Sequence, residues 1–443
     1  MTDKKTFRLQ TKFTRCLFWG ILSVCALVFL IWCDKKAYGI LRPNHVLPFG
    51  VLALSSLFLH LRDRKTSVST AIGFTAATPS YDIRFDYIRL FAVFSVLMIH
   101  CIDIALPVLS MEINEETTAL IQEVPPLLLK TAAVLRTCFY LGNTCFLMLT
   151  GALLFGRGTK EGIGAFYQRR FSKVVLTSII YFFFYIWQNG RLHPVCAATV
   201  KDAFYRILTG SIQEDCPFLW LVYMTISIYI AVPFLRYMFE SMTYRTLTAL
   251  SGLILLCSFL RTYTTMTADL LPFFAQWIGI AMIGYWVSRP ETRTYDRWIW
   301  IAALLSFLKV VLSVNPYVYW QAYVNYYVHM APLSIFMACG IFALTLHKKP
   351  ERKHFWDSLV MMFGKHSFTI LLLHWWVLYH IVIYTLNLDI TWKQPLVFAG
   401  TVIFVILASF AYGFLIDQTV VYTIRACYEW MVKQLHRICK HTK

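Results

Sequence analysis

Long apolar stretches separated by short polar segments recur along the whole chain. A stretch of about 17–25 apolar residues can cross a hydrocarbon core of ~30 Å, because a helix pairs its own backbone groups. The second stretch is short for a full crossing. We therefore predict an all-α polytopic membrane protein with twelve spans, at residues 16–33, 46–61, 85–106, 133–155, 171–187, 218–238, 246–260, 271–288, 298–313, 328–346, 366–385 and 396–417.

Charged residues are too few to build a water-facing surface. They make up 14% of the 443 residues, whereas 58% are hydrophobic, and soluble domains carry about 25% charged residues. A single soluble core is therefore excluded. The net charge of +18 does not indicate nucleic-acid binding, because the basic residues lie in short clusters between apolar stretches. We expect membrane lipids, and no nucleic acid, among the partners.

The distribution of these basic clusters predicts an orientation. Clusters of Lys and Arg occur at connections on one side of the predicted spans, beginning at Arg62, Arg157, Arg289, Lys348 and Arg425. On the other side, residues 314–327 carry no charge at all. Because cytoplasmic loops of membrane proteins are rich in Lys and Arg, this alternation predicts that both termini are cytoplasmic.

The composition of residues 66–82 is that of a flexible connector, with Ser, Thr, Ala and Gly prominent. The first two helices therefore look like an appendage to a ten-helix core. We predict an N-terminal helical hairpin at 1–65, the linker at 66–82, a ten-helix membrane domain at 83–420 and a basic cytoplasmic tail at 421–443.

The third apolar stretch carries charged side chains among lipid-compatible ones. Asp86 and Arg89 lie near its start, and His100 follows eleven residues after Arg89. On a helix, Arg89 and His100 share one face ~16 Å apart, and Asp86 can pair with Arg89 one turn away. Charges at such depth usually mark function. Two alternatives stay open, namely Arg89 reaching to the lipid headgroups and His100 as a hydrogen-bonded core histidine.

Five motifs, in order over residues 81–420, resemble the acyltransferase 3 family of membrane acyl-CoA-dependent acyltransferases. The family's first core helix carries Asp-x-x-Arg, ten residues and a His, as Asp86, Arg89 and His100 do here. The other four motifs are at Phe146–Leu154, Phe166–Lys173, Leu219–Pro233 and Gly364–His374. Four residues depart from the usual pattern: Thr144, Thr150, Ala152 and Leu371. Within the family, the chain is most similar to bacterial glycan O-acetyltransferases.

The resemblance implies roles for several side chains. His100 would act as general base on a hydroxyl or carry the acyl unit, with Arg89 and Asp86 in the same catalytic set. The phosphates of acetyl-CoA would be held by Arg89, Arg169, Arg170 and Lys173. The last three residues also fit plain positive-inside topology. The candidate tunnel-lining residues are His374, Ser367, Trp220 and Tyr223, and a packed aromatic core explains His374 equally well.

These observations predict a membrane O-acyltransferase of the bacterial inner membrane. It would move an acyl group, most simply acetyl, from cytoplasmic acetyl-CoA to a hydroxyl of a cell-surface or lipid-linked glycan. The sequence has no metal-ligand spacing, Gly-rich phosphate loop or G-x-S-x-G motif, so no metal is expected. The alternatives are a transporter or flippase of a glycan or lipid intermediate, with His100 and Arg89 as a proton-coupled pair, and a non-catalytic envelope protein.

Overall fold

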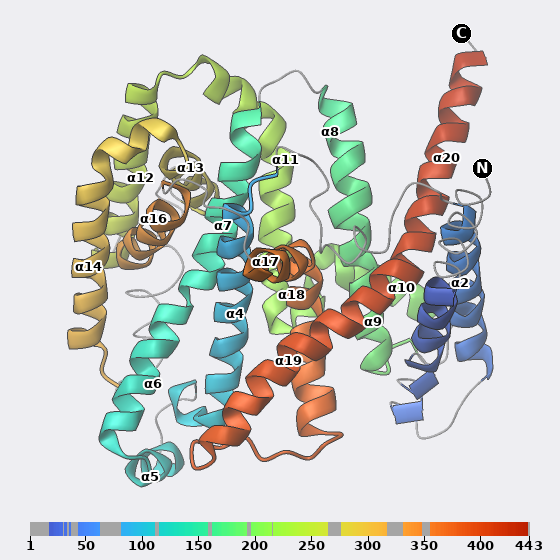
Figure 1. Cartoon of the computed structure of the whole chain (residues 1–443), viewed down its shortest axis with the longest axis horizontal. Coiled ribbons are helices and arrows are strands. Elements are labelled where there is room, and N and C mark those ends of the chain that lie inside the picture. Colours follow the sequence, from blue (N-terminus) through green and yellow to red (C-terminus); the bar gives the residue numbers. More distant parts are fainter. Residues whose placement is uncertain are drawn as a thin grey trace, which may run out of the picture. The chain divides into compact units, whose positions relative to one another are not determined.

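The structure is a computed structural model of the chain (Figure 1), in which the described residues are helical or lie in turns and loops between helices. The residues that it describes are 17–29, 31–32, 35–36, 43–62, 81–110, 115–157, 162–192, 196–214, 216–264, 276–316, 331–347 and 355–441. The chain divides into two compact units. The first comprises Met1–Ala77, Ile163–Tyr223 and Ala408–Lys443, and the second comprises Thr78–Gly162 and Met224–Leu407.

The second unit is built around the helix that carries the charged motif, α4 (Arg84–Ala105). Figure 1 shows α4 alongside α7, with α6 running into α7. The other helices that lie in this unit, wholly or in part, are α5 (Glu115–Glu123), α6 (Pro126–Phe139), α7 (Leu141–Leu154), α11 (Trp220–Ser241), α12 (Tyr244–Tyr263), α13 (Trp277–Val287), α14 (Asp296–Ser313), α16 (Pro332–Leu346), α17 (Phe355–Lys365), α18 (Ser367–Trp376) and α19 (Pro395–Ile416).

Glycines allow the closest helix contacts of this unit. A Cβ atom at Gly142 of α7 would lie 2.7 Å from the carbonyl oxygen of Ala92 on α4. At Gly151 of α7 and Gly284 of α13, a Cβ atom would clash with the backbone of the facing helix. Such small residues let helix backbones approach closely, which is how helices pack where lipid supplies little hydrophobic driving force. The position of α7 between α4 and α13 therefore depends on glycine at these three positions, because glycine has no side chain.

The first unit contains the remaining helices. They are an N-terminal helix at Leu17–Phe29, α2 (Pro43–Arg62), α8 (Ile163–Arg170), α9 (Leu176–Gln188), α10 (Ala197–Thr209) and α20 (Tyr422–His441), with π-helical turns at Phe171–Val175 (η3) and Asp417–Val421 (η10). His60 of α2 stacks between Trp19 and Tyr422, 3.9 Å from each ring. This sandwich joins three segments that are far apart in the sequence.

The prediction of an all-α polytopic membrane protein is confirmed, and each of the twelve predicted spans overlaps a helix of the described residues. Six helical segments of the described chain are long and apolar enough to cross a membrane: Arg84–Ala105, Pro126–Leu154, Ile163–Gln188, Pro217–Ser241, Tyr244–Tyr263 and Pro395–Leu435. Shorter apolar helices stand at Leu17–Phe29, Gly50–Leu61, Trp277–Val287 and Pro332–Leu346. The parts of the predicted spans next to some of these helices lie outside the described residues.

Two spans differ from their predicted form. The span predicted at 133–155 begins earlier, at Pro126, because Lys130 is accommodated by donating a hydrogen bond to the Val314 carbonyl. The span predicted at 366–385 is the second half of a bent pair, Trp356–Lys365 and Ser367–Ile383, with an angle of 67° between the halves. The predicted division into hairpin, linker, ten-helix domain and tail stays a prediction, and most of the linker lies outside the described residues.

Candidate active site

The predicted pair at the start of α4 is present. Arg89 donates a hydrogen bond from Nη1 to Asp86, and the Tyr81 hydroxyl donates a second to the same carboxylate. Burial and the hydrogen bond to Asp86 raise the pKa of Tyr81, so its hydroxyl stays protonated and donates. The Asp86 side chain is fully buried, whereas 27% of the Arg89 side chain is exposed. The buried carboxylate therefore fixes a guanidinium group that remains accessible.

The bent helix pair closes over this carboxylate. Gly364, in the last turn of α17, lies against Asp86, and a Cβ atom at Gly364 would stand 2.5 Å from the Asp86 Cβ and 2.9 Å from its Oδ1. Any larger residue would therefore displace the carboxylate. This contact explains why the motif at Gly364–His374 begins with glycine. It also fixes α17 against the charged end of α4 just before the 67° bend.

At the other end of α4, His100 meets the histidine that follows the bend. The rings of His100 and His374 stack with centroids 5.3 Å apart, and Trp375 lies edge-on to His100 at 4.9 Å. His374 is buried and donates a hydrogen bond from Nδ1 to the Leu371 carbonyl over 2.6 Å. A neutral His374 therefore leaves its Nε2 without a proton. His100 is only half-buried.

A second charged pair, which was not predicted from the sequence, lies close to His100. Asp103 lies one turn beyond His100 on α4 and accepts a hydrogen bond from Nε of Arg136 on α6. The Arg136 guanidinium also lies over the Tyr140 ring, with its carbon 5.4 Å from the centroid. The signal was available, because both residues are ionisable groups in helices that cross the membrane. Their pairing does not follow from sequence spacing, because the two residues are 33 positions apart.

The basic residues predicted to hold coenzyme A belong to the first unit. Arg169 and Lys173 are exposed, and Arg170 lies over the Phe166 ring at 5.6 Å. Arg425 and Glu429 of α20 lie close enough to act on the charge of Lys173. Glu429 also accepts a hydrogen bond from Ser172 over 3.2 Å. The helix α20 therefore extends the positive cluster with one more arginine and balances it with one glutamate.

The four candidate tunnel-lining residues fall into both units. His374 and Ser367 lie on α18 in the second unit, where both are buried. Trp220 and Tyr223 lie in the first turn of α11, in the first unit. The Tyr223 hydroxyl donates to the Ile207 carbonyl over 2.6 Å, and its ring stacks on Phe182 at 5.5 Å. Of the four, His374 is the residue that contacts His100.

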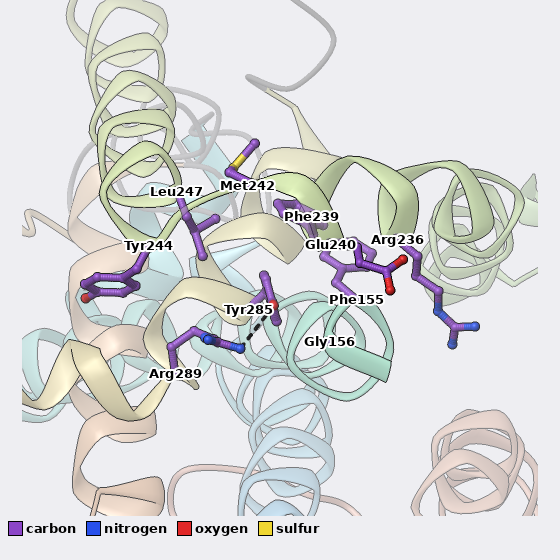
Figure 2. A pocket seen from close by; sticks show the side chains of 10 residues that line it. All are labelled: Phe155, Gly156, Arg236, Phe239, Glu240, Met242, Tyr244, Leu247, Tyr285 and Arg289. Atoms are coloured by element: carbon purple, nitrogen blue, oxygen red, sulfur yellow. Dashed lines mark hydrogen bonds between the residues drawn. The ribbon is translucent and has the colours of Figure 1, made fainter. Parts of the chain in front are cut away.

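A separate cavity of about 230 Å³ opens among α7, α11, α12 and α13 (Figure 2). Arg236 donates from Nε to the Leu154 carbonyl over 2.8 Å, and Arg289 lies beside the Tyr285 hydroxyl at 3.4 Å. Glu240 also lines the cavity, and Arg289 forms an ion pair with Glu291 over 3.0 Å. None of the residues predicted from the sequence lines it.

The fold and these buried charges define a multi-pass membrane protein with an intramembrane polar site around His100. Residues 82–414 match the model of the acyltransferase 3 family, which describes an acyltransferase domain. The chain belongs to this family and is therefore a membrane acyltransferase, as the motifs predicted. No curated protein and no solved structure matches the chain.

Proposed function

We propose that this acyltransferase moves an acetyl group from cytoplasmic acetyl-CoA to a hydroxyl of a lipid-linked or cell-surface glycan. The observation that carries the proposal is the position of His100, half-buried on α4 and stacked on His374 at 5.3 Å, on the helix that also presents Arg89. The protein would work in the bacterial inner membrane, with both termini cytoplasmic.

The chemistry of transfer requires a base. A sugar hydroxyl attacks a thioester only if its proton leaves as the new carbon–oxygen bond forms, and histidine is suited to take that proton. His100 would accept it, the carbon–sulfur bond would then break, and the proton would pass to the departing coenzyme A thiolate. The products are an acetyl ester and free coenzyme A. His374, whose Nδ1 is bound to Leu371, would fix the orientation of the His100 ring by stacking.

The donor would be held by cations. In the second unit, Arg89 presents a guanidinium group fixed by Asp86. The first unit has a positive cluster of its own, in which Arg169 and Lys173 are exposed and Arg170 is half-buried. Guanidinium groups bind phosphate oxygens through two parallel hydrogen bonds, and lysine adds a point charge. The flexible pantetheine arm of coenzyme A would extend from a phosphate bound at Arg89 towards His100, which lies ~16 Å beyond Arg89 along α4.

One observation favours the transporter alternative. The helix pair α17 and α18 is bent by 67°, and discontinuous helices are common at transport sites. In this chain, however, the helix before the bend contacts Asp86 and the helix after it contacts His100. The bend therefore brings both contacts to α4, as an enzyme site on that helix requires. Transport is the second candidate function.

The first experiment measures coenzyme A release from labelled acetyl-CoA by purified, detergent-solubilised protein, with envelope extract as acceptor. Wild-type protein should release coenzyme A and label the acceptor. His100→Ala should reduce both by at least ~100-fold, because a general base contributes roughly 10²–10⁴-fold. The matched control is His347→Gln, since His347 pairs with Asp296 on α14, remote from His100 along the helices.

Two results would contradict the proposal. If wild-type protein neither binds nor turns over acetyl-CoA, another acyl donor or a transport role takes precedence. If His100→Ala keeps wild-type activity while it folds normally, the base is a different residue. A control variant that loses as much activity as His100→Ala would show that any lost histidine inactivates the protein.

A further inference from the structure

The proposed transfer uses His100, His374 and Arg89 but leaves the ion pair of Asp103 and Arg136 without a role. Placing two charges in a membrane helix pair is costly, and a simple apolar contact would often stabilise the protein as well or better. The pair lies one helical turn from His100, on the side away from Arg89. Its position therefore suggests a task in binding the second substrate.

The exposure of the two partners indicates which of them meets a ligand. The Arg136 side chain is 5% exposed, whereas the Asp103 side chain is 22% exposed. Arg136 is also covered by the Tyr140 ring. The buried arginine therefore holds the carboxylate in one orientation from its protein side. The group that this end of α4 presents is a hydrogen-bond acceptor with two oxygens.

Two aromatic side chains lie at the same end of α4 as this carboxylate. Trp375 is edge-on to His100 at 4.9 Å, and the Tyr379 ring lies 4.3 Å from Trp375 with a tilt of 33°. Tyr379 is close enough to Asp103 to feel its charge. Both aromatic residues are half-buried, like His100 and Asp103. The four side chains are therefore neighbours, and all of them remain partly accessible.

We propose that Asp103, Trp375 and Tyr379 form the acceptor subsite and that its ligand is a neutral pyranose. This inference rests on the proposed transfer. A carboxylate accepts hydrogen bonds from two adjacent sugar hydroxyls, and the C–H face of a pyranose packs on an aromatic ring. The neighbouring His100 would then meet a hydroxyl of the bound sugar. Acidic sugars are disfavoured, because their carboxylate would face Asp103 in a poorly screened site.

The test separates donor chemistry from acceptor binding. Purified full-length protein is given acetyl-CoA with methyl β-D-glucopyranoside, methyl N-acetyl-β-D-glucosaminide, methyl β-D-glucuronide or glycerol. The readouts are coenzyme A release without acceptor, the KM of each acceptor and the KM of acetyl-CoA. In wild-type protein, we expect the two neutral glycosides to stimulate release and to be preferred over the glucuronide and glycerol.

Asp103→Asn should raise the KM of the neutral glycosides at least tenfold and change the KM of acetyl-CoA less than twofold. It should also narrow the preference for neutral sugar over glucuronide, which a purely structural effect would not do. The matched control is Asp296→Asn, the same change in an α14 aspartate that is hydrogen-bonded to His347. Trp375→Leu and Tyr379→Leu each replace the aromatic ring with an apolar side chain and should raise the acceptor KM severalfold, so the test survives poor folding of Asp103→Asn.

Several outcomes would overturn the inference while the proposed function stands. One is wild-type coenzyme A release that no neutral glycoside stimulates above glycerol. Another is an acceptor KM and a neutral-to-acidic preference that Asp103→Asn and the two aromatic variants leave unchanged. A rise in acceptor KM in Asp296→Asn as large as in Asp103→Asn would also overturn it. Absence of coenzyme A release with every acceptor, envelope extract included, would overturn both proposals.

Discussion

Two aspartate–arginine pairs flank the polar face of α4, and their exposure is reversed. In the pair of Asp86 and Arg89, the carboxylate is fully buried and 27% of the arginine is exposed. In the pair of Asp103 and Arg136, the arginine is 5% exposed and the carboxylate 22%. The first pair thus presents a cation, and the second presents an anion. His100 lies between them on the same helix.

The difference shows how the same type of ion pair can present either a cation or an anion to a ligand. The buried partner fixes the position of the exposed one, and the exposed partner determines which ligand is attracted. A presented guanidinium suits the phosphates of an acyl donor, whereas a presented carboxylate suits the hydroxyl groups of an acceptor. A chain that must bring an anionic donor and a neutral acceptor to one histidine gains from both arrangements.

The largest effect is expected on stability at the second pair. Arg136→Leu would leave the Asp103 carboxyl in the membrane helix without its partner, and breaking a buried pair in this way typically costs ~3–5 kcal/mol. The double variant Asp103→Leu and Arg136→Leu should recover most of that loss, because an apolar pair replaces an ion pair with little net cost. Thermal unfolding in detergent measures both. A double variant as unstable as the single one would mean that the pair is needed for folding itself.

At the first pair, the expected loss falls on donor use. Arg89→Ala should lower kcat/KM for acetyl-CoA about 10–100-fold, since charge-assisted hydrogen bonds are worth ~1.5–3 kcal/mol. Arg89→Lys should be intermediate, because lysine keeps the charge without the planar fork. The control is Arg84→Ala, five residues earlier on α4, whose arginine binds Asp82 and the Leu346 carbonyl. Equal losses in Arg84→Ala and Arg89→Ala would remove the special role of Arg89.

The glycine that faces Asp86 offers a milder test of the same end. Gly364→Ala would push against the Asp86 carboxylate, and overpacking of this kind costs ~1–3 kcal/mol. We expect a lower melting temperature together with a higher KM for acetyl-CoA, because a displaced Asp86 carboxylate would move the Arg89 guanidinium that it binds. Gly400→Ala in α19 is the control, since a Cβ atom there meets nothing within 4 Å. An unchanged KM would show that Arg89 keeps its position without Asp86.

The sequence predicted the local part of this comparison well. The third span was expected at 85–106 and is Arg84–Ala105, because charges bracket a continuous apolar run. The pairing of Asp86 with Arg89 follows from a spacing of three residues on a helix. The family resemblance added His374, whose contact with His100 joins positions that no periodicity connects.

The rest depended on tertiary packing. Asp103 meets Arg136 only because α6 packs against α4, and an apolar pattern does not say which helices are neighbours. The helix α17 was missed because Asp357 and Lys365 make it read as a polar connection. The exposure reversal could not be predicted either, since it depends on Gly364 covering one carboxylate and Tyr140 covering one guanidinium.

The basic cluster should give a smaller effect that depends on salt. Lys173→Ala is expected to raise the KM of acetyl-CoA two- to fivefold at low ionic strength, because Lys173 is exposed. The difference from wild type should shrink as salt reaches ~1 M, where the screening length falls to ~3 Å. Lys201→Ala, an exposed lysine on α10, is the control. A KM effect that salt does not change would argue against phosphate binding by Lys173.

The smallest effect is expected just before α4, where Arg84 binds Asp82 through Nε at 2.9 Å and Nη2 at 2.7 Å. Burial opposes ionisation, but these hydrogen bonds outweigh it and hold the pKa of Asp82 below its ordinary value. The ionised form is thus stabilised in the folded protein, so the contribution is complete above about pH 5 and fades as the pH falls below about 4.

Asp82→Asn should therefore cost less than ~1 kcal/mol near neutral pH, and its melting temperature should converge with that of wild type in acid. Asp202→Asn is the control, because the Asp202 side chain in the pair with Arg206 is 49% exposed. If the melting temperature of wild type exceeded that of Asp82→Asn by more in acid than at neutral pH, the ionised Asp82 would not be the stabilising form. Asp82 lies four residues before Asp86, and its side chain is partly exposed, whereas that of Asp86 is fully buried. A small effect of Asp82→Asn beside a large effect of Arg89→Ala would show that the buried carboxylate is the one that orients an arginine for binding.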